Sequence, residues 1–133
     1  MKSILLTSIP KYDLVAPPAA IGILQGVAKD HNLETAVFDF NLYLNKNLTE
    51  EEWQELDNWC VFIKHKISKK LQQKICRLWD TGISEKLPAG CEFLLISIFS
   101  YWSLYVARLL IKHENNNIRP YKLIVGGNGV VSK

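Results

Sequence analysis

The sequence has few cysteines, and they are poorly spaced for a disulfide framework. Its 133 residues include three, Cys60, Cys76 and Cys91, which lie 16 and 15 positions apart. An odd number of widely spaced thiols is typical of reduced cysteines inside a cell and not of a small disulfide-stabilised domain. We therefore expect a cytoplasmic protein.

Long apolar runs and strong charge are also missing. No stretch approaches the roughly 20 apolar residues of a membrane span, and the short run after Met1-Lys2 is broken at Pro10-Lys11, so no export signal is visible. The net charge is only +3, and the lysines are scattered or concentrated on one helical stretch. These features argue against a membrane or a nucleic acid as partner and favour a small molecule or another protein.

Short runs of branched apolar residues are present, and helical patterns separate them. Such runs are typical of buried parallel strands, and a strand, a helix and a strand within about 40 residues match one βαβ unit. We expect one domain over residues 1–133 with an α/β fold, a doubly wound, Rossmann-like or flavodoxin-like, mainly parallel sheet of about four strands. The expected strands are Ser3–Ile9, Leu33–Phe40, Glu92–Phe99 and Tyr121–Val125, and the expected helices Ala19–His31 and Trp102–Asn115.

A helical insertion is expected between the second and third strands, over residues of about 44–88. Thr49 and Glu52 have the spacing of a capping box, and apolar residues recur every three or four positions from Trp53 to Leu78. This periodicity predicts a helical stretch as far as Trp79, with one buried stripe and with its lysines in solvent. After the fourth strand no further helix follows, although doubly wound domains usually have more strands, so the chain has the pattern of a fragment or of one module of a longer protein.

The loops after the strands are the candidate ligand site, because open parallel sheets bind ligands beyond the carboxyl ends of their strands. The loop from Thr7 to Lys11 contains no glycine, which argues against the dinucleotide and Walker phosphate loops. We find no acid–base, nucleophile or metal-ligand constellation, so no catalytic residue and no metal ligand is assigned. What remains is a surface of small groups, Ser97, Ser100 and the Gly126-Gly127 pair, that would admit a large flat ligand.

Several segments together resemble a known family. They are the prolines before Ala19-Ala20-Ile21-Gly22, the strand end Asp39-Phe40-Asn41, the stretch Ser97-Ile98-Phe99-Ser100, and Val125-Gly126-Gly127. In their order and spacing they resemble the amino-terminal cobalamin-binding domain of cobalamin-dependent radical S-adenosylmethionine enzymes. The resemblance covers nearly all of the chain outside the insertion.

The resemblance implies a vitamin B12 cofactor, cobalamin, whose corrin ring rests on the loops after the first, third and fourth strands. On this basis cofactor binding is assigned to Ser8, Ile9, Pro10, Ser97, Phe99, Ser100, Tyr101, Gly126, Gly127 and Asn128. The Asp-x-His-x-x-Gly motif of other cobalamin domains is absent, so no histidine lower ligand to cobalt is expected. The Cys-x-x-x-Cys-x-x-Cys motif is absent too, so no iron–sulfur cluster is expected in this chain, and a radical catalytic domain or another protein would be its partner.

Plainer interpretations of the same residues stay open. Ser97 and Ser100 could cap the following helix, Gly126-Gly127 could be a simple turn, and Asp39 could either bind a ribose hydroxyl or end its strand. Tyr101 and Trp102 could line a pocket or pack on the insertion. Two other functions also remain: a noncatalytic protein-interaction domain that kept the fold without the cofactor, and a nucleotide- or sugar-binding Rossmann-like domain.

Overall fold

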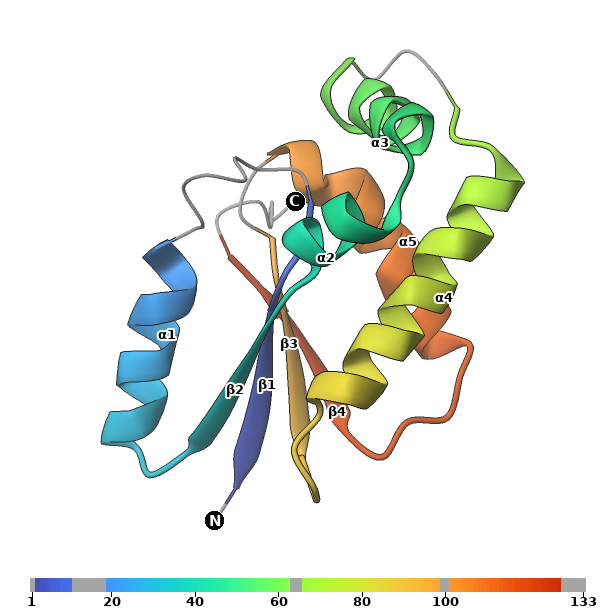
Figure 1. Cartoon of the computed structure of the whole chain (residues 1–133). Helices are drawn as coiled ribbons and strands as arrows, with labels where there is room; N and C mark the ends of the chain where they lie inside the picture. Colours follow the sequence, from blue (N-terminus) through green and yellow to red (C-terminus); the bar gives the residue numbers. More distant parts are fainter. Residues whose placement is uncertain (1, 11–18, 63–65, 99–100, 128–133) are drawn as a thin grey trace, which may run out of the picture.

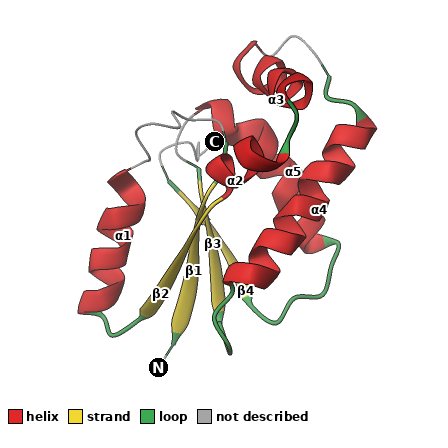
Figure 2. Cartoon of the chain, in the orientation of Figure 1, coloured by secondary structure: helices red, strands yellow, loops and turns green. Residues whose placement is uncertain are grey.

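Four parallel strands form the centre of the molecule, with helices on both faces (Figures 1 and 2). The computed structural model describes residues 2–10, 19–62, 66–98 and 101–127. The strands are β1 (Ser3–Ser8), β2 (Glu34–Asp39), β3 (Phe93–Ser97) and β4 (Lys122–Gly126). The helices are α1 (Ala19–Asp30), α2 (Phe40–Asn47), α3 (Glu50–Asp57), η1 (Asn58–Phe62), α4 (Lys69–Lys86), η2 (Tyr101–Ser103) and α5 (Leu104–Asn115).

The strand order is β2-β1-β3-β4, and every pair of neighbours is parallel. The chain therefore moves outward from β1 to one edge, crosses back over β1 to β3, and ends at the other edge. Right-handed crossovers then place α1 on one face of the sheet and α4 with α5 on the other, as Figure 1 shows. This arrangement confirms the α/β, doubly wound, Rossmann-like fold expected from the sequence.

The two faces of the sheet bury cores of very different size. On the face covered by α4 and α5, twenty buried residues form one cluster, which includes Leu5, Leu94 and Trp79. On the α1 face the described residues form a small buried cluster of Leu6, Ile21 and Leu95. Leu5 and Leu6 separate in this way because successive side chains of a strand point to opposite faces.

Local signals in the sequence account for several helix ends. Asn32 ends the segment after α1 with a φ of 58°, the left-handed conformation that asparagine tolerates better than most residues. Thr49 caps α3: its hydroxyl accepts from the Glu52 N–H at 3.2 Å, and the Glu52 carboxylate accepts from the Thr49 N–H at 2.9 Å. This reciprocal pair is the capping box that the sequence predicts.

The insertion between β2 and β3 is helical but not continuous. The apolar periodicity predicts one helical stretch to Trp79. In the structure α3 ends at Asp57 and is followed by the π-helical turn η1, and α4 is a separate helix with Ser68 as its N-cap. Ser68 accepts from the Leu71 N–H at 3.2 Å, while its own N–H donates to Glu55 at 2.7 Å. The stripe is nevertheless buried at Leu56, Leu71 and Ile75, so the apolar pattern specifies burial on both sides of the break.

Candidate functional site

The strand register places four short polar or small residues in one row across the sheet. Ser8 of β1 is aligned with Asp39 of β2 and with Ser97 of β3, and Ser97 is aligned with Gly126 of β4. Each of these residues is the last of its strand. The row Asp39, Ser8, Ser97 and Gly126, here called the terminal row, therefore marks the carboxyl edge of the sheet, at the top in Figure 1.

The terminal row faces the α1 side of the sheet. Ser8 lies two residues after Leu6, and Ser97 two residues after Leu95, both of which belong to the small core under α1. Each serine is 3% exposed. Short side chains thus replace the larger apolar ones at the end of this face, so the side chains there project less far from the sheet.

The topology reverses next to these serines. From β1 the chain goes to β2 on one side, and from β3 it goes to β4 on the other, so the loops after β1 and β3 diverge. Such a switch point is where open α/β sheets bind ligands. Ser8 and Ser97 are the aligned pair on its two sides.

Gly126, the last residue of β4, and Gly127, the residue after it, differ in what requires them. A Cβ on Gly127 would lie 2.5 Å from the Ile98 carbonyl oxygen, and its φ of 114° is one that other residues rarely adopt. A Cβ on Gly126 would have nothing within 4 Å among the described residues. Packing therefore explains Gly127 as a close turn, one of the two interpretations that the sequence left open. No described residue fills the space beside Gly126 at the end of the terminal row.

Other residues at this edge have identifiable structural partners. Asp39 is the N-cap of α2, and its carboxylate accepts from the Leu42 N–H at 3.0 Å, which supports the strand-end interpretation of this acid. The Ser103 hydroxyl, fully buried, lies 3.5 Å from the Ile9 carbonyl oxygen and ties the start of α5 to the end of β1. Ser97 lies inside β3 and does not cap α5, whose N-cap is Ser103.

The remaining residues of the expected site fall into three groups. Ile9 and Pro10 are buried just beyond β1, and Ile9 belongs to the large core. Tyr101 is exposed at 61%, as is its neighbour Trp102 at 49%, and neither is buried against the insertion. Three expected residues, Phe99, Ser100 and Asn128, lie outside the described residues.

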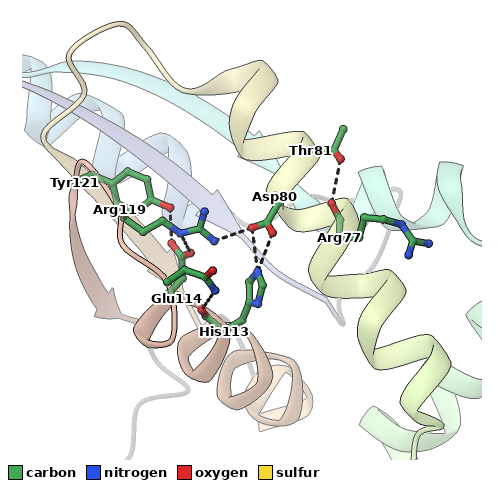
Figure 3. A network of polar contacts seen from close by, with 8 residues as sticks. Arg77, Asp80, Thr81, His113, Glu114, Arg119 and Tyr121 are labelled. Carbon is green, nitrogen blue, oxygen red and sulfur yellow. Dashed lines mark hydrogen bonds and ion pairs between the residues drawn. The ribbon is translucent and has the colours of Figure 1, made fainter.

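The densest polar network lies at the opposite end of β4 and was not foreseen from the sequence. Figure 3 shows Asp80 of α4 between His113 and Arg119, at 2.9 Å and 2.7 Å. Arg119 also pairs with the buried Glu114 at 2.7 Å, and Glu114 accepts a 2.5 Å hydrogen bond from the Tyr121 hydroxyl. These residues join α4, α5 and the segment before β4 at the amino end of the sheet, so the network stabilises the fold away from the terminal row.

The thiols and metal-binding residue types do not form a reactive centre in the described part of the chain. Burial, and then the charge of Asp80, raise the pKa of Cys76, which keeps its thiol protonated and a poor nucleophile. Within the described ranges no three His, Cys, Asp or Glu side chains gather closely enough to hold a metal ion. No described helix is both long and apolar enough to cross a membrane.

Comparison of the chain with protein-family models, with curated proteins and with solved structures finds no match.

Proposed function

We propose that this domain is a cobalamin-binding module that holds the corrin ring against the carboxyl edge of its sheet and presents it to a radical catalytic domain or another protein. The observation that carries the proposal is the terminal row, in which Ser8 and Ser97 are aligned at the topological switch point and Gly126 continues the row. A broad planar ligand needs such a strip of short side chains.

The residues present fit a corrin in shape. Among the described residues nothing lies within 4 Å of a Cβ built on Gly126, so a larger side chain there would project over the terminal row. Ile9 and Pro10 are buried behind it, which supports a firm surface below the ring. Ser8 and Ser97 are small and almost fully buried, so they leave the edge flat beneath a ring.

Among the described histidines, none is placed to reach cobalt over this strip. His31 follows α1 and lies at the amino end of β2, where its Nδ1 is 2.9 Å from the Val27 carbonyl oxygen. His113 pairs with Asp80 at the amino end of β4. The expectation of a cofactor without a histidine lower ligand is therefore retained in the proposal.

Bound cobalamin would supply a cobalt centre able to carry a methyl group. The chain's own part is to bind the ring on this flat edge and to shield the side of the ring that faces the sheet. Because Cys60, Cys76 and Cys91 are free thiols, we place this activity in a reducing compartment, the cytoplasm.

A second candidate is a noncatalytic interaction domain, which the exposed aromatic pair Tyr101 and Trp102 favours. Aromatic side chains in solvent are typical of binding surfaces for proteins. Under this alternative the edge would bind no cofactor.

Hydroxocobalamin distinguishes the two. The purified chain, mixed with hydroxocobalamin and passed through gel filtration, is expected to elute with the red corrin absorbance. Gly126→Leu fills the open space beside the terminal row and should release the pigment, whereas Gly26→Leu, at an open position on the exposed side of α1, should retain it. A colourless wild-type protein, or equal retention by both variants, contradicts the proposal.

A further inference from the structure

A positively charged groove lies between the helical insertion and α5, away from the terminal row. Its volume is about 470 Å³. It is formed by η1, by the start of α4 and the residues before it, and by one side of α5. The groove, here called the basic groove, is lined by Trp59, Lys66, Ile67, Lys69, Gln72, Tyr105, Arg108, Leu109 and Lys112.

The described residues around the basic groove supply no counter-charge to its cations. Lys66, Lys69, Arg108 and Lys112 are all exposed, and none of the described residues that line the groove is acidic. Within the described part of the chain none of the four forms an ion pair. Like charges gathered in this way create a positive potential that a complementary anionic surface would relieve.

The floor of the groove is apolar and already ordered. Trp59 and Tyr105 stack with their ring centroids 5.4 Å apart, and the Arg108 guanidinium lies 6.0 Å from the Tyr105 centroid. Nucleic acids bind such surfaces by stacking bases on free aromatic faces, and here a base would have to displace these contacts. The groove therefore fits a carboxylate-bearing protein surface better than a nucleic acid.

An acidic surface of this kind adjoins the groove on the same chain. This surface, here called the acidic face, comprises Glu50, Glu51, Gln54 and Glu55 of α3 with Asn58, the first residue of η1. Acids in the first turn stabilise α3 through its helix dipole, but Glu50 and Glu51 have no ion-pair partner among the described residues. Their charge remains available to another molecule.

The two surfaces meet at one short segment. Glu55 of the acidic face accepts a 2.7 Å hydrogen bond from the Ser68 N–H, and the neighbours of Ser68, Ile67 and Lys69, line the basic groove. A twofold axis near Ser68 would place the acidic face of one copy over the basic groove of the other, twice over. Such a self-complementary contact closes as a dimer.

We propose that two copies of this chain associate through these surfaces, the acidic face of each lying in the basic groove of the other. The contact depends on charge, so the dimer weakens as salt rises and the Debye length falls from about 14 Å near 50 mM to about 4 Å near 500 mM. It uses the insertion and α5 and leaves the terminal row uncovered, so it stands or falls independently of cobalamin binding.

Sedimentation velocity in low salt tests the proposal by charge reversal. Arg108→Glu with Lys112→Glu, or Glu50→Lys with Glu51→Lys, should each weaken the dimer by about tenfold or more. An equimolar mixture of the two double variants should restore it, since both contacts of the mixed dimer pair opposite charges again. Lys2→Glu with Lys122→Glu makes the same change in net charge as the groove variant at exposed positions elsewhere, and should leave the dimer intact.

Three results would overturn the proposal. The first is a wild-type chain that stays monomeric in low salt at about 300 μM, a concentration well above the dissociation constant that we expect for this dimer. The second is a pair of reversed variants that dimerise as the wild type does or are not restored by mixing, because the groove's occupant is then not α3. The third is a wild-type monomer that binds a labelled single-stranded RNA through the same four cations, which would assign the groove to nucleic acid.

Discussion

Alanine at Gly126 and at Gly127 should have opposite effects on stability, although the two positions are adjacent. At Gly127 the φ of 114° is unfavourable for any side chain, and a Cβ would lie 2.5 Å from the Ile98 carbonyl oxygen and 3.0 Å from the Ile98 nitrogen. Both atoms belong to the backbone of the segment after β3 and cannot turn aside. We expect Gly127→Ala to cost about 2 kcal/mol or more, the order of a strained backbone conformation.

At Gly126 the backbone has an ordinary φ and a Cβ meets nothing within 4 Å among the described residues. Gly126→Ala should therefore stabilise the fold by about 0.5 kcal/mol, because alanine restricts the unfolded chain more than glycine does. For a domain of this size about 1 kcal/mol shifts the melting temperature by about 4 °C. Thermal unfolding followed by circular dichroism should thus show Gly127→Ala melting about 8 °C lower and Gly126→Ala about 2 °C higher.

The comparison refutes the reasoning if both variants lose the same stability, because the space beside Gly126 would then be filled. It also does so if Gly127→Ala melts like the wild type, since the close approach to Ile98 would then be wrong. The same pair bears on the proposed site: only a position with room to spare is available for a ligand.

Two further predictions concern the core and the network at the amino end of the sheet. A Cβ on Gly82 would overlap the buried ring of Phe38, so Gly82→Ala should lower the free energy of unfolding in urea by about 1–3 kcal/mol. Gly26→Ala, at an open position of α1, should instead raise this free energy by about 0.5–1 kcal/mol. Equal effects of the two substitutions would contradict the packing of α4 on β2. Burial, followed by the hydrogen bond to Glu114 and its charge, raises the pKa of Tyr121 above its ordinary 10.0, so the folded state keeps this proton at a pH where the unfolded state loses it. The stability that Tyr121 contributes is therefore complete below pH 10 and is lost as the pH rises above 10. The difference in unfolding free energy between the wild type and Tyr121→Phe should shrink over the same range. A difference that stays constant with pH would contradict the raised pKa of Tyr121.

The strands and their direction could be predicted from the sequence because each carries a local signal. Branched apolar runs mark β1 and β3, and the single residue Asn32 marks the end of the segment after α1. The capping box at Thr49 was likewise readable, since it depends on two residues three positions apart. Signals of this kind act within one turn or one strand and need no knowledge of the rest of the fold.

Long-range relations could not be predicted in the same way. Ser8 and Ser97 were expected near a ligand, but their alignment with each other and with Asp39 follows from the strand register, which packing sets. The Asp80 network joins residues up to 39 positions apart and has no sequence motif. The break between α3 and α4 was also missed, because the apolar stripe continues through it and periodicity alone does not reveal a change of helix.

The unequal cores on the two faces of the sheet imply that parts of the domain open at different free energies. Among the described residues, the buried cluster under α1 consists of Leu6, Ile21 and Leu95, whereas α4 and α5 share the larger one. Segments with little buried apolar contact exchange their amide protons through local opening, well below the cost of global unfolding. The amides of α1 should therefore exchange first, because this helix can detach from its side of the terminal row while the sheet and the insertion remain folded.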